Sequence, residues 1–178
     1  MKEIEKDKKA NSKDKGINSR YHDYLILNYN KKVVLITGRV HPGETQASFS
    51  LEGMVNWILS DIPEAREMRA NYIIYVMPML NIDGVVHGNQ RTNLAGFDLN
   101  RKWSDPSPYL APIIYTTKML SKMIQDEREI EIYADLHGHY QPCGTFMYCN
   151  SYDRGTGVPP TKYHQNASLR VIPYLLTQ

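Results

Sequence analysis

The sequence predicts an α/β fold in which a mostly parallel, mixed sheet carries helices on both faces. Two observations predict it. Short apolar, β-branched segments alternate with helical patterns along the chain, and one of these segments is apolar on both of its faces. The order strand, helix, strand, helix, strand requires crossover connections, which cover both sides of a parallel sheet. Ligands of such sheets gather at the carboxyl ends of the strands.

The first strand and the first helix are separated by a tight turn. Residues 33–37 are apolar for long enough to form a buried strand, and Pro42 and Gly43 then turn the chain. Pro63 stops the helix that follows, and it can open a short helix over residues 64–69. The longer helix is indicated by apolar residues that recur on one face: Ala47, Leu51, Met54, Val55, Ile58 and Leu59.

The middle of the chain predicts a second strand, a long loop and a second helix. Residues 72–76 are apolar on both faces, which is typical of a central strand between two helical layers. Residues 81–108 are irregular and rich in Asn, Asp, Arg and Gly, and loops of this length in compact domains are usually functional. The helix expected over residues 111–125 has an inner side formed by Ile113, Ile114, Thr117, Leu120, Met123 and Ile124.

The two ends of the chain are less regular. Strands are expected over residues 131–136 and 145–148, and a helix interrupted by Pro173 is expected over 164–176. A short edge strand is expected over residues 24–27. Residues 1–20 are charged and contain few large apolar side chains, which indicates a disordered polar tail. Residues 21–178 then form one domain or part of one.

Composition excludes several classes of protein. The 42% hydrophobic content is ordinary for a globular protein, and a net charge of +2 is too small to indicate a nucleic-acid partner. No apolar run approaches the roughly 20 residues of a membrane span, so we expect no membrane partner. The start of the chain does not have the pattern of a secretory signal, and Cys143 and Cys149 are too few for a disulfide framework. We therefore expect a cytoplasmic protein whose cysteines are small buried residues; its oligomeric state is not predicted.

Three residues at strand ends predict a metal site. His41 and Glu44 lie on the turn after the first strand, and His137 comes directly after the strand 131–136. Zn²⁺ accepts imidazole and carboxylate ligands, and catalytic zinc sites usually have three protein ligands and water. Zinc-assisted hydrolysis is therefore the expected chemistry. His139 alternates with His137, so that only one of them easily faces a given site; His139 could support a ligand, face a substrate or be exposed.

The long polar loop contains a second group of candidate residues. Asp98, Asn100 and Arg101 lie together in it, and Arg91 precedes them. Two guanidinium groups and an amide suit anion capture, because Arg binds carboxylates in bidentate pairs. Ordinary salt bridging within the loop explains the same residues equally well.

Six segments, taken in order, closely resemble the cytosolic carboxypeptidases, a branch of the zinc metallocarboxypeptidases that trims glutamate from tubulin tails. The resemblance runs from about residue 33 to residue 148. It implies a metallocarboxypeptidase-like fold, peptide or protein C-terminal tails such as those of tubulin as partners, and zinc as cofactor. The segments are residues 38–45, 78–85, 88–91, 94–101, 135–139 and 146–148.

The resemblance also implies residue roles. His41, Glu44 and His137 match the zinc ligands, and Asp98 matches a carboxylate that orients the first zinc histidine. Arg91 matches the catalytic arginine that polarises the scissile carbonyl and stabilises its oxyanion. The substrate's terminal carboxylate would be bound by Asn100 and Arg101.

The chain departs from the family's pattern near its C-terminus. The family's general-base glutamate and its specificity pocket lie several tens of residues beyond the third zinc ligand. This chain ends 41 residues after His137, and it contains neither Glu nor Asp after Asp153. We therefore expect a partial catalytic domain over residues 21–178, incomplete at the C-terminus and inactive alone. The alternatives are an aspartoacylase-like zinc deacylase and a non-catalytic zinc-binding paralogue.

Overall fold

The computed structural model describes residues 31–141, 144–149 and 170–175. Two compact units make up the chain, residues 1–138 and residues 139–178. Among the described residues, the helices and strands belong to the first unit apart from a helical stretch at residues 170–175. In order they are β1 (Lys32–Gly38), α2 (Gln46–Leu59), α3 (Pro63–Asn71), β2 (Tyr72–Met77), α4 (Ile82–Val86), the 3-10 helix η1 (Leu99–Arg101), α5 (Pro112–Glu127) and β3 (Ile130–Leu136).

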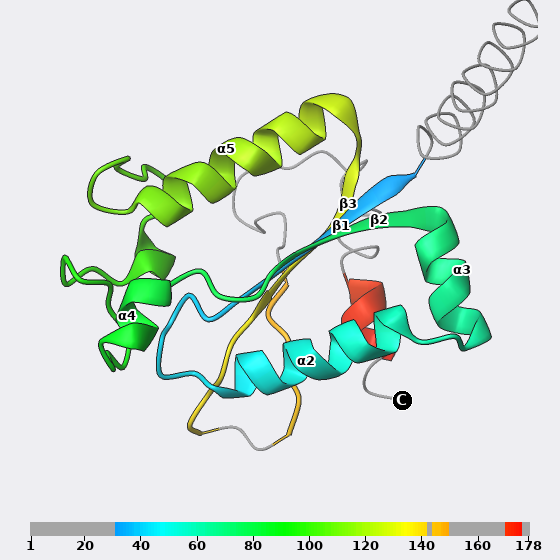
Figure 1. The fold of residues 1–178 in the computed structure, drawn as a ribbon, viewed down its shortest axis with the longest axis horizontal. Coiled ribbons are helices and arrows are strands. Elements are labelled where there is room, and N and C mark those ends of the chain that lie inside the picture. The colour runs from blue at the N-terminus through cyan, green and yellow to red at the C-terminus, as the bar shows by residue number, and fades with distance from the viewer. Residues whose placement is uncertain (1–30, 142–143, 150–169, 176–178) are drawn as a thin grey trace, which may run out of the picture. The chain divides into compact units, whose positions relative to one another are not determined.

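The three described strands form one parallel sheet in the order β2-β1-β3. β1 lies at the centre, and every residue in it after Lys32 is buried, as expected for a β-branched apolar strand that is covered on both faces. Thr37 lies opposite Met77 on one side and Asp135 on the other. Because both pairings are parallel, the carboxyl ends of all three strands meet at one edge of the sheet (Figure 1).

Helices cover both faces of this sheet, which confirms the predicted α/β architecture (Figure 1). Successive side chains of β1 point to opposite faces. On one face Val34 and Ile36 pack with apolar residues of α2, and on the other Val33 and Leu35 pack with Ile124 of α5. None of the helices in the described part of the chain has the length and apolar character needed to cross a bilayer.

A third apolar cluster supports the loops at the carboxyl edge. Its members follow strand ends or begin helices, and they are drawn from four separate segments of the chain. Burying them ties these loops to the sheet, since each fully buried aliphatic side chain stabilises by roughly 1.5–3 kcal/mol. The buried members are Val40, Leu80, Leu99, Ala111 and Ile114.

The structure describes one neighbour of β2. In the described sheet β2 pairs with β1, so a central position for the strand expected over residues 72–76 stays a prediction. Ile74 packs on the α2 side, whereas Ile73 and Met77 pack on the α5 side. Its apolar pattern on both faces therefore reflects cover by helices above and below, and it does not report which strands lie beside it.

The long loop contains short helices that the sequence did not predict. α4 is capped by the Asn81 side chain, which accepts a hydrogen bond from the Gly84 N–H at 3.0 Å. η1 is capped by Asp98, which accepts from the Asn100 N–H at 2.9 Å. Helices this short display no apolar periodicity, so capping residues were their only sequence signal.

Several other expectations are corrected. Residues 145–148 are irregular and form no strand; instead the Phe146 ring packs edge-on against Tyr148, with centroids 5.6 Å apart. On α5, Met123 is 61% exposed and Leu120 37% exposed, so the inner side is narrower than predicted. Cys149 is exposed, because it follows this irregular segment and not a buried strand.

The remaining expectations concern the ends of the chain. Residues 170–175 are helical through Pro173, so the described part of that helix is not interrupted there. The polar tail over 1–20, the edge strand over 24–27, Cys143 and residues 164–169 lie outside the described residues. The domain boundary after residue 20 accordingly stays a prediction.

Candidate metal centre

The carboxyl edge of the sheet brings His41, Glu44 and His137 together. His41 lies on the turn after β1, Glu44 lies just before α2, and His137 follows β3. One side-chain donor atom from each of the three lies within 4.8 Å of the others. The parallel register explains this convergence, because it sets Gly38 beside Leu136 at the ends of the two strands.

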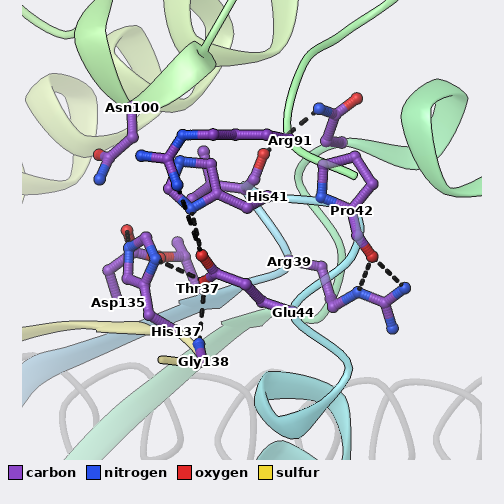
Figure 2. A network of polar contacts seen from close by, with 12 residues as sticks. Thr37, Arg39, His41, Pro42, Glu44, Arg91, Asn100, Asp135, His137 and Gly138 are labelled. Atoms are coloured by element: carbon purple, nitrogen blue, oxygen red, sulfur yellow. Dashed lines mark hydrogen bonds and ion pairs between the residues drawn. The ribbon is translucent and has the colours of Figure 1, made fainter. Parts of the chain in front are cut away.

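Glu44 lies between the two imidazoles. Its Oε1 is 2.7 Å from His41 Nδ1, and its Oε2 is 2.9 Å from His137 Nδ1. The Gly138 N–H also donates to Oε2 at 2.8 Å, which fixes the carboxylate from the β3 side (Figure 2). Both histidines therefore direct the same ring nitrogen toward one point beside the Glu44 carboxylate.

Each imidazole is supported on its far side by an aspartate. His41 Nε2 lies 3.0 Å from Asp98 Oδ1, and His137 Nε2 lies 2.9 Å from Asp135 Oδ2. Carboxylates at these positions favour the tautomer with the proton on Nε2, which leaves the Nδ1 lone pair available to a metal. The donor set of two imidazoles and one carboxylate fits zinc.

The charges of the centre shift two pKa values. The hydrogen bond to Asp135 raises the pKa of His137; burial works against this shift, whereas the charges of Asp135 and Glu44 add to it. Burial raises the pKa of Asp98, but hydrogen bonds from His41, Arg91 and the Asn100 N–H more than offset it, so that the net pKa is lowered. Asp98 is therefore held as a charged acceptor beside His41.

Asp135 is itself positioned by β1. Thr37, which lies opposite it in the register, donates its hydroxyl hydrogen to Asp135 Oδ1 at 2.8 Å. The Tyr133 hydroxyl lies 3.2 Å from the Thr37 hydroxyl, and partial burial raises the pKa of Tyr133 to about 12. Sequence reasoning assigned no role to Asp135 or Thr37. The available signal was the spacing of Asp135 and His137, which places both side chains on one face of a strand.

Arg91 reaches the same centre from the long loop. Its Nε–H donates to Asp98 Oδ2 at 2.8 Å, and its Nη1 lies 3.8 Å from Glu44 Oε1. Arg91 is thus linked through Asp98 to His41, on the side of the centre seen at the top of Figure 2. Arg91 therefore contacts Asp98 through Nε and approaches the Glu44 carboxylate through Nη1.

Asn100 and Arg101 are placed differently from Arg91. The Asn100 Oδ1 accepts a hydrogen bond from the Trp103 indole at 3.0 Å, so its amide N–H donors are directed away from the indole. Arg101 is exposed, and its described contact is with the Asn100 carbonyl at 3.4 Å. Among the described contacts none joins Arg101 to the three residues of the metal centre.

His139 belongs to the second unit. Its ring stacks on Tyr140, with centroids 5.1 Å apart and the planes 5° from parallel, and it meets Phe146 edge-on at 5.5 Å. These contacts describe its surroundings within that unit, and its predicted place outside the zinc ligands stays a prediction.

Comparison with known proteins places this centre in a family. The sequence profile described as zinc carboxypeptidase matches residues 17–173. Cytosolic carboxypeptidase 1 of Gallus gallus is 36% identical over 172 residues, which are 90% of this chain and 14% of that protein. Cytosolic carboxypeptidase 6 of Mus musculus is 46% identical over 125 residues, which are 69% of this chain and 23% of that protein.

Solved structures agree with these relatives. A carboxypeptidase A-like protein from Shewanella denitrificans superposes with a TM-score of 0.58 at 37% identity, covering 63% of this chain and 29% of that one. A metallo-carboxypeptidase from Pseudomonas aeruginosa, in complex with (2-guanidinoethylmercapto)succinic acid, gives 0.54 at 28% identity, covering 62% and 28%. The chain spans 14% and 23% of the two curated relatives' lengths. Its sequence, its fold and its donor set make it a member of the zinc carboxypeptidase family.

Proposed function

We propose that this chain carries the metal centre and part of the substrate site of a cytoplasmic zinc carboxypeptidase that removes C-terminal glutamate from protein tails such as those of tubulin. The observation that carries the proposal is the convergence of His41, Glu44 and His137 on one point, with an aspartate behind each imidazole. Family membership supplies the metal and the reaction class.

The donor set indicates what the centre can do. When bound, zinc supplies Lewis-acid polarisation of a carbonyl and acidifies water. Glu44 and the two Nδ1 atoms would hold it, while Asp98 and Asp135 keep both imidazoles oriented. We assign to Arg91 the donation of hydrogen bonds to an oxyanion that develops on the substrate, and the 3.8 Å distance between its Nη1 and Glu44 Oε1 supports this role.

Substrate capture is assigned to the loop. The Asn100 amide, whose oxygen is occupied by Trp103, offers its N–H donors to the terminal carboxylate, and Arg101 adds an exposed guanidinium. Two comparisons support a carboxylate-binding site: the curated relatives are named carboxypeptidases, and the Pseudomonas aeruginosa neighbour holds a succinic acid derivative. Glutamate and tubulin come from the resemblance to the cytosolic branch.

Binding to the 178-residue chain tests this proposal directly. Loaded with zinc, the chain should bind a peptide ending in several glutamates at least about tenfold more tightly than the same peptide with an amidated C-terminus, because only the free acid offers a carboxylate to Asn100 and Arg101. Equal binding of acid and amide would contradict a carboxypeptidase. Preference for an N-acyl amino acid over the peptide would favour the deacylase alternative instead.

Turnover needs a separate measurement. The same chain is assayed for glutamate release from the peptide, with and without a chelator. The expectation that these 178 residues alone hydrolyse peptides poorly stays a prediction, and this assay decides it. A general base supplies about 10²–10⁴-fold in rate, so tight binding without release would show that the site captures substrate but lacks its proton acceptor.

A further inference from the structure

We propose that Arg39 is a positioning residue for the metal centre, and that its buried guanidinium fixes the turn carrying His41 and Glu44. The inference rests on the proposed function, because it concerns the same centre. It starts from the backbone. Arg39 has a φ of +55°, and among the described residues it is the one non-glycine with a positive φ. An L residue rarely adopts this conformation, whereas glycine adopts it freely.

The Arg39 side chain does what a glycine could not do. Its Nε and Nη2 both donate to the Pro42 carbonyl oxygen, at 3.1 and 2.7 Å (Figure 2). Its Nη1 donates to the Ser48 hydroxyl at 2.8 Å, in the first turn of α2. One side chain thus joins the end of β1, the carbonyl between His41 and Glu44, and the helix that follows Glu44. The left-handed backbone directs the side chain back toward the turn.

Within the described part of the chain, the contacts of Arg39 are hydrogen bonds to neutral oxygens. The residue is 9% exposed, and no carboxylate in the described part of the chain pairs with it. Its three hydrogen bonds end on neutral oxygens, one carbonyl and one hydroxyl. Burying a guanidinium costs free energy unless its N–H donors are hydrogen-bonded. The planar guanidinium of Arg39, called its fork below, therefore favours a role in which its hydrogen bonds set the geometry of the turn.

The opposite side of the turn is held by other segments. The Asn81 N–H donates to the Arg39 carbonyl at 3.0 Å, and the Gly43 N–H donates to the Gln90 carbonyl at 2.8 Å. The Asn81 side-chain amide also donates to the Val40 carbonyl, at 3.3 Å. Between Val40 and Gly43, the Pro42 carbonyl has the Arg39 fork as its described partner. Without the Arg39 guanidinium, the Pro42 carbonyl loses this partner, and the described contact that still holds the Pro42–Gly43 peptide is the Gly43 N–H bond to Gln90.

The test measures zinc affinity and fold stability separately in the 178-residue chain. Zinc dissociation constants come from competition with a chromophoric chelator, and Co²⁺ absorption reports the ligand geometry. Arg39→Met removes the fork but keeps the strained backbone. Arg39→Gly removes the fork and relieves the backbone. Both variants should bind zinc about 10–100-fold more weakly, the range for residues that orient metal ligands, and both should change the Co²⁺ spectrum.

Arg69 provides a matched control. Its guanidinium also donates to backbone carbonyls, those of Ile58 and Ser60, but at the other end of α2. Arg69→Met should lower the melting temperature of the metal-free chain and leave zinc affinity unchanged. A loss of stability alone would therefore not imitate the effect expected at Arg39.

The outcomes separate this inference from the proposed function. Zinc binding as tight as the parent's in folded Arg39→Met or Arg39→Gly would overturn the inference and leave the function standing. If the parent itself binds no zinc, the proposed function fails. Should both variants at Arg39 fail to fold, Ser48→Ala decides, because it removes one of the three hydrogen bonds. A zinc affinity lowered about threefold or more would support the inference, and an unchanged one would overturn it.

Discussion

Glu44 and His137 are 93 positions apart in the chain, yet Glu44 Oε2 lies 2.9 Å from His137 Nδ1. The other oxygen of the same carboxylate lies 2.7 Å from His41 Nδ1. With the proton of each imidazole on Nε2, both Nδ1 lone pairs and the Glu44 carboxylate face the same point, which is the arrangement that a shared metal ion requires.

Single substitutions should distinguish the two histidines that bind zinc from histidines that do not. His41→Ala and His137→Ala should each abolish stoichiometric zinc binding, because a site with two remaining ligands holds zinc weakly. His139→Ala, and His87→Ala at the exposed end of α4, should retain it. Metal analysis after dialysis measures the bound zinc. Loss of zinc in His139→Ala with retention in His137→Ala would reverse the assignment.

The aspartates behind the imidazoles should tune affinity without being ligands. Asp135→Asn and Asp98→Asn replace a charged acceptor by a neutral one, and each should weaken zinc binding by about 10–100-fold. Asp126→Asn is the matched control, since Asp126 forms an exposed pair with Lys122 on α5 and should have no effect. Chelator competition measures all three. Unchanged affinity in both Asp135→Asn and Asp98→Asn would show that imidazole orientation does not depend on them.

The turn before Glu44 should tolerate no side chain at Gly43. A Cβ there would lie 2.8 Å from the Gln90 carbonyl oxygen, a backbone atom that cannot rotate away. Gly43→Ala should therefore destabilise the metal-free chain by about 1–3 kcal/mol. Gly53→Ala is the opposite case. Its Cβ would meet nothing within 4 Å, and in the interior of α2 it should stabilise by roughly 0.5–1 kcal/mol. Urea unfolding measures both variants, and equal effects would contradict the steric argument.

Trp103 should matter for carboxylate capture but not for zinc. Its indole N–H fixes the orientation of the Asn100 amide. Trp103→Phe keeps an aromatic ring but removes this hydrogen bond, which is worth roughly 0.5–1.5 kcal/mol. Because about 1.4 kcal/mol corresponds to a tenfold change in an equilibrium constant, the affinity for the glutamate peptide should fall about 2- to 10-fold, while the zinc affinity stays constant. Trp57→Phe, on α2, is the control. Unchanged peptide binding in Trp103→Phe would remove Trp103 from the substrate site.

The two arginines should affect different kinetic constants in a longer, active version of the protein. Arg91→Ala should mainly lower kcat, by about 10²–10³ if it stabilises an oxyanion. Arg101→Ala should mainly raise KM, because it removes a carboxylate contact made equally in ground and transition states. Steady-state kinetics on the glutamate peptide distinguish them. A raised KM in Arg91→Ala with unchanged kcat would exchange the two roles.

The sequence by itself determined the order of strands and helices and the residues gathered at the strand ends. β1, α2, β2, α5 and β3 follow from apolar periodicity, which is a local property of the chain. The same reasoning selected His41, Glu44 and His137, which the fold brings within 4.8 Å of one another. Parallel strands make that convergence predictable, because their carboxyl ends share an edge.

The family resemblance implied Asp98 as the support of His41, but only the tertiary structure decided which other groups support the centre. The strand order β2-β1-β3 of the described sheet, the hydrogen bond from Thr37 to Asp135 and the contact of Trp103 with Asn100 have no local sequence signature. The fork of Arg39 on Pro42 is local in sequence, but it depends on a left-handed backbone that no rule for arginine predicts. Strand register and side-chain direction are set by packing between distant segments, and that packing exists only once the chain has folded.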